Sequence, residues 1–301
     1  MTRCGFVALI GEPNAGKSTL MNRMVGAKVS IVTHKVQTTR ARIRGIALEG
    51  ESQIVFVDTP GLFKTRRALD RAMVAAAWSG ASDADIVVLL IEAHRGITDG
   101  VRMILDGLAE RQGHQRLALA INKIDRVPSE KLLALTSKMN SLAAFEETFM
   151  ISAEKGHGVH DLAAWLAKEL PEGPWLYDED QIADIPMRML AAEITREKLM
   201  LRLHQELPYQ LTVETESWQE RKDGSVRIDQ VIYVARDGHK GIVLGPKGET
   251  IKAISMQARG EITESVGKKT HLFLEVKVRP NWLTEAERYS EMGLDFSDTK
   301  S

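Results

Sequence analysis

The segment from Gly11 to Thr19 constrains this chain more than any other, because it has the phosphate-loop pattern G-x-x-x-x-G-K-[S/T]. An apolar run, residues 6–10, precedes it and predicts a buried strand, and apolar residues at helical spacing follow it. Strand, loop and helix together aim a helix N-terminus at bound phosphate, where backbone N–H groups and the helix dipole favour an anion. We therefore expect Lys17 to reach the β- and γ-phosphates and Ser18 to place its hydroxyl on Mg²⁺. The residues expected to bind the nucleotide here are Gly11, Glu12, Pro13, Asn14, Ala15, Gly16, Lys17, Ser18 and Thr19.

Composition limits which classes of protein the chain can belong to. The 301 residues, of which 44% are apolar, suffice for two ordinary domains. A net charge of −1 gives no bulk attraction to nucleic acid or membrane, so any such attraction must come from a local patch. The single cysteine, Cys4, excludes an intrachain disulfide and fits a reducing compartment. No apolar stretch is long enough to span a bilayer, and we expect a cytoplasmic protein.

Two further segments predict the Mg²⁺ side of the nucleotide site. A strand-like run, residues 53–57, ends at Asp58-Thr59-Pro60-Gly61. A carboxylate at Asp58 can hold Mg²⁺ through water, and Gly61 lets a backbone N–H approach the γ-phosphate. A threonine hydroxyl from residues 36–40 can complete the Mg²⁺ shell only when γ-phosphate is present, which describes a switch.

Asn122-Lys123-Ile124-Asp125 predicts which base is bound, because it follows another strand-like run, residues 117–121. The Asp125 carboxylate can accept both N1–H and N2–H₂ of guanine, whereas adenine would present a lone pair to it. Asn122 can serve guanine O6 or N7, and the Lys123 stem can cover the ring. A later strand-like run leads into Ser152-Ala153-Glu154, whose backbone N–H groups can meet the base oxygen. Two mismatched buried polar groups would discriminate strongly against other bases.

The regular alternation of strand-like and helical segments stops in the second half of the chain. Prolines and a glycine predict a linker at residues 171–180, which separates a domain at 1–170 from one at 181–301. Helical spacing begins after Pro186, and alternating residues around Asp223-Gly224 predict a hairpin. A last alternating strand covers residues 272–278. The predicted fold class is therefore an α/β phosphate-loop domain followed by an α+β domain.

Between the hairpin and the last strand lies Gly245-Pro246-Lys247-Gly248, the G-x-x-G form with which KH domains clamp a nucleic-acid backbone. The motif alone is weak, but the order helix, hairpin, motif, helix and strand favours RNA binding. Residues 221–279 contain 12 Lys and Arg against 7 Asp and Glu. The candidate RNA-binding residues are Gly241, Ile242, Gly245, Pro246, Lys247, Gly248 and Lys252.

This ordered series of motifs resembles the Era family of ribosome-assembly GTPases, which have a C-terminal KH domain. The resemblance covers nearly the whole chain. It implies that Lys17, Thr39 and Gly61 serve catalysis, and that Ser18, Thr39 and Asp58 hold Mg²⁺. It also implies binding to 16S-type ribosomal RNA near its 3′ end and a role in 30S subunit assembly, whereas it does not identify a stable protein partner. Pro246 departs from the family, where lysine is common, and this removes a charge and an N–H from the clamp.

Two rival functions and two features that bear on the rate of hydrolysis also follow from the sequence. A nucleotide-dependent kinase would use the same phosphate loop, but the Asn122–Asp125 segment disfavours adenine. A membrane-associated regulatory GTPase, peripheral on the cytoplasmic face, would use the C-terminal domain for lipid or protein. Leu62 occupies the position of the water-orienting glutamine of Ras-like enzymes, so intrinsic hydrolysis should be slow. Asn14 resembles the asparagine that binds K⁺ in cation-activated relatives, or it only bonds within its own loop.

Overall fold

The chain divides into two compact units. The computed structural model describes residues 1–35, 38–40, 43–65, 67–111, 116–280, 282–292 and 294–299. Unit 1 comprises Met1–Ser30, Val36–Asp184 and Ser290–Ser301, and unit 2 comprises Ile31–Lys35 and Ile185–Tyr289. By this division the linker expected at 171–180 lies within unit 1, and the boundaries 1–170 and 181–301 stay a prediction.

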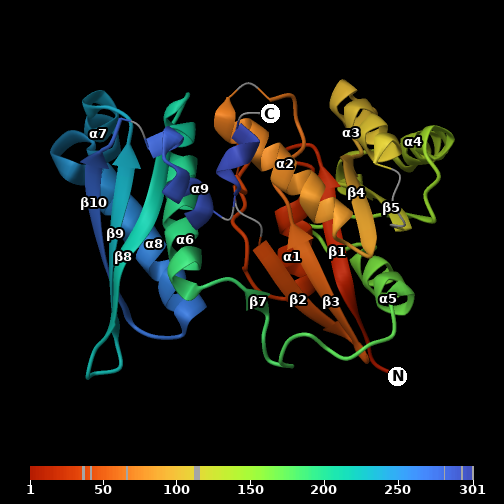
Figure 1. Cartoon of the computed structure of the whole chain (residues 1–301), viewed down its shortest axis with the longest axis horizontal. Coiled ribbons are helices and arrows are strands. Elements are labelled where there is room, and N and C mark those ends of the chain that lie inside the picture. Colours follow the sequence, from red (N-terminus) through yellow and green to blue (C-terminus); the bar gives the residue numbers. More distant parts are fainter. Residues whose placement is uncertain are drawn as a thin grey trace. The chain divides into compact units, whose positions relative to one another are not determined.

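Unit 1 is built on a sheet whose order is β6-β5-β4-β1-β3-β2-β7 (Figure 1). Neighbours from β6 to β3 are parallel, whereas β2 and β7 pair antiparallel. The strands are β1 (Arg3–Gly11), β2 (Ile43–Glu49), β3 (Ser52–Asp58), β4 (Ile86–Glu92), β5 (Arg116–Asn122), β6 (Glu147–Met150) and β7 (Ala183–Asp184). The helices are α1 (Lys17–Val25), α2 (Ala68–Ser82), α3 (Asp99–Glu110), α4 (Ser129–Leu142) and α5 (Val159–Glu169).

The central strands are mostly apolar because helices cover this sheet and bury their side chains. Every residue of β3 and β4 is buried, as expected for central strands of a mostly parallel sheet. Ala8, Val87 and Leu119 pack in one core cluster with apolar side chains of α2, α3 and α4. The parallel strands end at one edge of the sheet, so the phosphate loop, Asp58 and Asn122 are delivered to the same edge.

Unit 2 has a three-stranded sheet of order β10-β9-β8. Its elements are α6 (Met187–Arg202), β8 (Leu211–Glu220), β9 (Val226–Val234), α7 (Asp237–Leu244), α8 (Glu249–Val266) and β10 (Thr270–Val278). The hairpin predicted at Asp223-Gly224 joins β8 and β9, which pair antiparallel, and β10 runs parallel to β9. Together with unit 1, this order confirms the predicted fold class.

Two short segments belong to a different unit from the residues next to them in the sequence. Ile31–Lys35 belongs to unit 2, where the Val32 N–H donates to Glu197 Oε1 at 2.8 Å. The chain continues from β10 through α9 (Ala286–Glu291), and its C-terminal turn belongs to unit 1. In that turn Thr299 O accepts a 2.9 Å hydrogen bond from Arg71 Nε on α2. Within the described ranges, none of the helices combines the length and the apolarity needed to cross a membrane.

Candidate nucleotide and nucleic-acid sites

The phosphate loop has the conformation that its glycines predict. Gly16 caps α1 with φ +102°, and a Cβ there would lie 2.2 Å from Asn122 Nδ2, so only glycine fits. Lys17 is buried, and its Nζ donates to the carbonyl oxygens of Gly11 and Glu12 at 3.1 Å each. Burial lowers the pKa of Lys17 to about 8, although Asp58 and Glu12 act in the opposite direction. The ammonium group is thus held inside the loop that is expected to surround phosphate.

Asp58 is the point where the predicted Mg²⁺ ligands meet. Its Oδ2 accepts hydrogen bonds from Ser18 Oγ at 2.6 Å and from Thr39 Oγ1 at 3.3 Å, and the two hydroxyl oxygens lie 3.0 Å apart. Ser30 Oγ donates to the same oxygen at 2.8 Å. We call Ser18, Ser30, Thr39 and Asp58 the Asp58 cluster. Burial raises the pKa of Asp58, while the hydrogen bond from Ser18 and the charge of Lys17 oppose the rise.

The Asp58 cluster fits a magnesium ion. Asp58 is fully buried, and its Oδ1 has no hydrogen-bond partner among the described residues. Mg²⁺ prefers oxygen ligands, and the cluster offers a carboxylate and two hydroxyls from the predicted set of Ser18, Thr39 and Asp58. A cation beside Oδ1 would remove the cost of an unpaired buried carboxylate oxygen.

Sequence reasoning missed Ser30 and the residue that holds it. Asn22 on α1 accepts from the N–H groups of Val29 and Ser30 at 2.9 Å each and donates to Ser30 O at 2.7 Å. These three bonds fix the start of the loop that leads to Thr39. Val36 and Gln37, which belong to the predicted switch segment, lie outside the described residues.

The base-reading segment is joined to the phosphate loop by side chains. Asn122 Nδ2 donates to Ala15 O at 2.8 Å, and its Oδ1 accepts from the N–H groups of Lys123 and Ala153. Lys123 Nζ donates to Asn14 O and to Glu92 Oε2, each at 2.7 Å. The structure therefore shows Asn122 tying three loops together, and its contact with guanine stays a prediction.

Asp125 is exposed and is oriented by a neighbouring hydroxyl. Ser152 Oγ donates to Asp125 Oδ1 at 2.6 Å, and this bond lowers the pKa of Asp125. The carboxylate is thereby kept ionised and available as an acceptor. Arg23 on α1, which the sequence did not single out, donates to Ala153 O at 3.2 Å and to Glu154 O.

Three positions that the sequence analysis singled out make contacts that the sequence does not reveal. The side chain of Glu12 turns to Thr98, whose Oγ1 donates to Glu12 Oε2 at 2.7 Å, so only its backbone faces the loop interior. Gly61 lies so close to the phosphate loop that a Cβ would be 2.8 Å from Pro13 N. Leu62 is fully buried in the core, and its N–H donates to Gly11 O at 3.0 Å.

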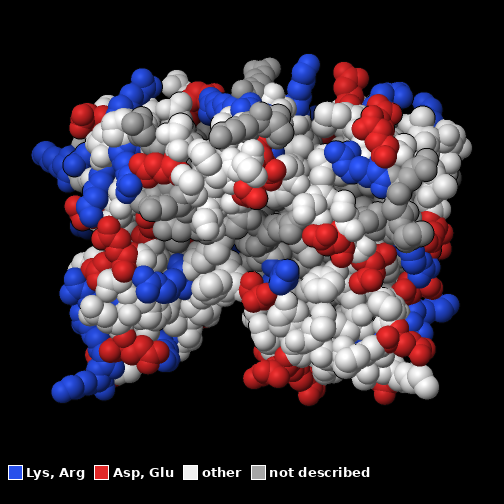
Figure 2. Space-filling view, in the orientation of Figure 1, with Lys and Arg blue, Asp and Glu red and all other residues white. Residues whose placement is uncertain are grey.

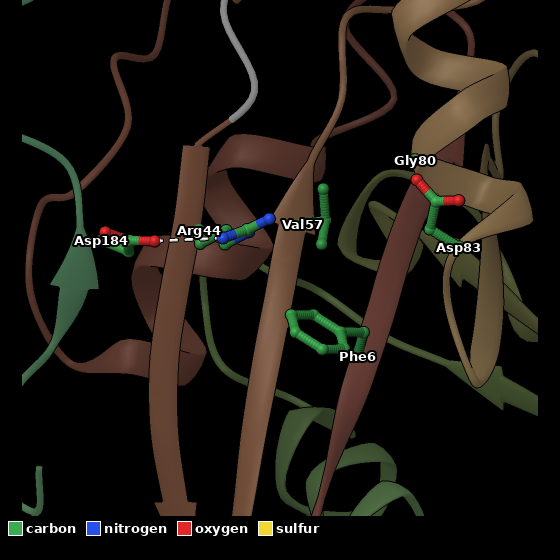
Figure 3. Close-up of a pocket in the computed structure, with 6 residues that line it drawn as sticks. All are labelled: Phe6, Arg44, Val57, Gly80, Asp83 and Asp184. Carbon is green, nitrogen blue, oxygen red and sulfur yellow. Dashed lines mark hydrogen bonds and ion pairs between the residues drawn. The ribbon is translucent and has the colours of Figure 1, made fainter. Parts of the chain in front are cut away.

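A cavity of about 330 Å³ opens elsewhere on unit 1, and Figure 3 shows six residues that line it. Arg44 bonds Asp184 Oδ2 at 3.1 Å, and its guanidinium lies 5.6 Å from the centre of the Phe6 ring. No residue predicted to bind nucleotide is among those shown. We conclude that this cavity is separate from the nucleotide site.

The G-x-x-G turn joins α7 to α8 and is solvent-accessible. Gly245 has φ +71° and ψ 174°, a conformation nearly exclusive to glycine, and Gly248 caps α8. The N–H of Gly248 donates to Gly245 O, and that of Glu249 donates to Pro246 O. Because these amides serve the turn and Pro246 has none, we expect the exposed Lys247 side chain to supply the loop's attraction for phosphate.

The other predicted RNA-binding residues lie near this turn. Gly241 and Ile242 are exposed on α7, and Lys252 is exposed on α8. Figure 2 shows Lys and Arg along the side of unit 2 that carries α7 and β10 and at the tip of the β8–β9 hairpin. Asp and Glu lie among these basic residues, and Lys268 and Lys277 are paired with Glu220 and Glu216, so the surface is mixed in charge and the local excess of Lys and Arg is partly neutralised.

Comparison with known families and sequences agrees with the two predicted domain types. Residues 6–123 match the sequence model of a family described as 50S ribosome-binding GTPase, and residues 206–283 match that of the KH domain. The chain is 76% identical over 298 residues to GTPase Era of Dinoroseobacter shibae, which covers 99% of this chain and 97% of the relative. It is 65% identical over 295 residues to GTPase Era of Rhizobium meliloti, which covers 98% and 94%.

Two solved structures are similar over nearly the full length. One is a variant of Aquifex aeolicus Era bound to GDP and AlF₄⁻, and the other is Era in complex with MgGDPNP and nucleotides 1506–1542 of 16S ribosomal RNA. Each has a TM-score of 0.92 and 35% sequence identity, and covers 97% of this chain and 99% of the solved chain.

Ser30→Ala should raise the Mg²⁺ concentration needed to retain a bound guanine nucleotide by about fivefold. The variant loses a hydrogen bond to an ionised carboxylate, worth about 1 kcal/mol or more, which orients Asp58. Release of a fluorescent GDP analogue, followed against Mg²⁺ concentration, measures the effect. Ser30→Thr keeps the hydroxyl and serves as the matched control. An unchanged Mg²⁺ midpoint in a Ser30→Ala variant with normal thermal unfolding would contradict this role.

Proposed function

Because this chain belongs to the Era family of GTPases, we propose that it is a GTP-hydrolysing switch that binds 16S-type ribosomal RNA near its 3′ end and assists assembly of the 30S subunit. The observation that carries the GTP-dependent switch is the Asp58 cluster. In it, Ser18 of the phosphate loop and Thr39 of the switch segment both bond the buried carboxylate of Asp58, at the end of β3. Such a cluster lets the state of the nucleotide control the position of a loop.

Each residue of the site has a role in this proposal. Lys17 places its charge on the β- and γ-phosphates, and Gly61 presents a backbone N–H to the γ-phosphate. Ser18, Thr39 and Asp58 hold Mg²⁺, which supplies further positive charge beside the same phosphates. Thr39 has a ligand to contact only while the γ-phosphate is in place, so hydrolysis releases the loop. The solved Era complex with MgGDPNP supports Mg²⁺ as the ion.

Hydrolysis by the protein alone should be slow. The alkyl side chain of Leu62 is fully buried, and it can neither donate nor accept a hydrogen bond to orient water. K⁺ at Asn14 would add charge beside the β- and γ-phosphates without an arginine from another molecule. Asn14 has a φ of +68°, a left-handed conformation in which asparagine is more frequent than most other residues.

Asp125→Asn should reverse the choice of base. The amide can donate to the C2 carbonyl of xanthine, whereas it no longer accepts both donors of guanine. We expect the ratio of GTP to XTP affinity to fall by at least about tenfold, since one unmet polar group costs about 1–3 kcal/mol. Competition binding measures this ratio. Ser152→Ala removes only the bond that orients Asp125, so it should weaken GTP without favouring XTP. A GTP preference that survives Asp125→Asn would remove this assignment.

The K⁺ proposal is tested by GTP turnover in KCl and NaCl of equal ionic strength. We expect faster turnover in KCl for the wild-type chain and equal rates for Asn14→Gly. Glycine is the suitable replacement because it adopts the positive φ of Asn14 without strain while removing the amide. Equal wild-type rates in the two salts would leave Asn14 with a role in its own loop only.

The G-x-x-G turn offers a charge-matched test of RNA binding. A Cβ at Gly248 would meet nothing within 4 Å, whereas one at Gly245 would lie 2.1 Å from Thr250 Oγ1 and disturb the packing. Gly248→Asp and Gly248→Asn therefore compare two side chains of one shape that differ in charge. We expect Gly248→Asp to weaken RNA binding at least about tenfold relative to Gly248→Asn, with GTP hydrolysis intact. Equal RNA affinity for the two variants would place the RNA site elsewhere on unit 2.

Location is part of the proposal and has its own test. We place the protein in the cytoplasm, with peripheral association at the inner face of the cell membrane. The alternative function is a membrane-associated GTPase whose C-terminal domain binds lipid or protein. Cosedimentation of the chain with 30S subunits is the result expected for the ribosomal function. Cosedimentation with anionic vesicles but not with 30S subunits would favour the alternative function.

A further inference from the structure

Unit 2 contains a cavity of about 360 Å³ beside the G-x-x-G turn. The cavity lies between the end of α6, the turn that follows α6, and the face of α7 that carries Ile242. Thr250, at the start of α8, also lines it, and the Thr250 hydroxyl lies against Gly245 of the clamp. The cavity therefore shares a wall with the turn that is proposed to hold the RNA backbone.

The lining combines an apolar surface with positive charge. Leu203 is buried, and Ile242 exposes 57% of its surface, so part of this aliphatic side chain is available for contact. Arg202 and Arg236 are exposed at the cavity, and within the described part of the chain neither is paired with a carboxylate. Glu206 is the acidic residue of the lining. An apolar floor with two guanidinium groups suits a nucleotide, whose base packs on apolar or planar groups while its phosphate is neutralised.

A buried histidine in the wall gives an independent indication of a ligand. His239 is 6% exposed, and its Nε2 accepts a 2.7 Å hydrogen bond from Arg236 Nε. The ring proton is therefore on Nδ1, and this buried N–H has no hydrogen-bond partner among the described residues. Burial and the charge of Arg236 lower the pKa of His239, so the ring is neutral. A buried donor without a partner is rare in folded proteins. Nδ1 is closed off from solvent in this conformation, so an acceptor of a ligand satisfies it only once the ring or a neighbouring side chain moves.

We propose that this cavity is a subsite for one nucleotide of the RNA chain, next to the nucleotides held by the G-x-x-G turn. Its phosphate lies between Arg202 and Arg236, its base or sugar packs on Leu203 and Ile242, and an acceptor of the nucleotide bonds His239 Nδ1. The subsite rests on the proposed RNA-binding function and adds a contact beyond the loop. A KH loop holds about four nucleotides, so this one is the next along the strand.

Oligonucleotide length tests the subsite directly. The full chain is titrated by fluorescence anisotropy with ribonucleotides of four, five and six residues from the 3′ end of 16S-type ribosomal RNA, extended at either end. Adding a fifth residue at one of the two ends, and not at the other, should raise the affinity of the wild-type chain about tenfold. Arg202→Gln should reduce this gain to less than about twofold while leaving tetranucleotide affinity nearly unchanged. Arg259→Gln, which removes an exposed charge from the distant part of α8, should keep the full gain.

The side chain of His239 supplies a second measurement. The five-residue RNA should shift the Nδ1–H resonance of His239 in the nitrogen-15-labelled chain, and the tetranucleotide should not. An equal length gain in wild type and Arg202→Gln, or an unmoved His239 resonance, would overturn the subsite while RNA binding itself stands. Adenosine monophosphate is the control for a free nucleotide. If it shifts the His239 resonance while affinity does not rise from the four-residue to the five-residue RNA, the cavity binds free nucleotides and the proposed subsite is overturned. If the tetranucleotide fails to bind the wild-type chain, the RNA function falls and the subsite falls with it.

Discussion

The burial of the Asp58 carboxylate is the constraint on which unit 1 depends. An ionised carboxylate without solvent is costly, so the chain must bring compensating groups to it from several segments. Lys17 supplies charge, and hydroxyls of the Asp58 cluster arrive from α1 and from both ends of the loop before β2. Their combined contacts fix where the phosphate loop ends and where the switch segment begins. The remaining orphan oxygen, Oδ1, is what a divalent cation would satisfy.

The base-reading end is assembled by the same physical means, with amides in place of a carboxylate. Asn122 donates to Ala15 O and accepts from Ala153 N, so one side chain holds the phosphate loop and the loop after β6 at fixed positions. Arg23 adds a bond from α1 to Ala153 O. A ligand that binds across these loops meets surfaces already oriented, which reduces the ordering cost of binding.

The sequence predicts the fold and the segments that meet at the candidate nucleotide site because their signals are local in the chain. The apolar runs at β3 and β4, the capping glycine Gly16 and the spacing of Lys17 and Ser18 each follow from a few consecutive residues. Asn22 and Ser30 could not be found in this way, because their roles arise only when α1, the following loop and β3 meet. For the same reason the sequence could not foresee that Ile31–Lys35 belongs to unit 2, nor that Glu12 turns its side chain to Thr98.

The two sites differ in how much of their binding capacity lies in the backbone. The phosphate loop opens α1, so helix N-terminal amides and the buried Lys17 act together on an anion. The G-x-x-G turn also precedes a helix, but its amides at Gly248 and Glu249 are committed to the turn, and Pro246 contributes none. We therefore expect the exposed side chain of Lys247 to supply much of the attraction of this turn for an RNA backbone. Because side-chain charge at one loop attracts any phosphate backbone equally, a preference for a particular strand requires surfaces beyond the loop that contact bases.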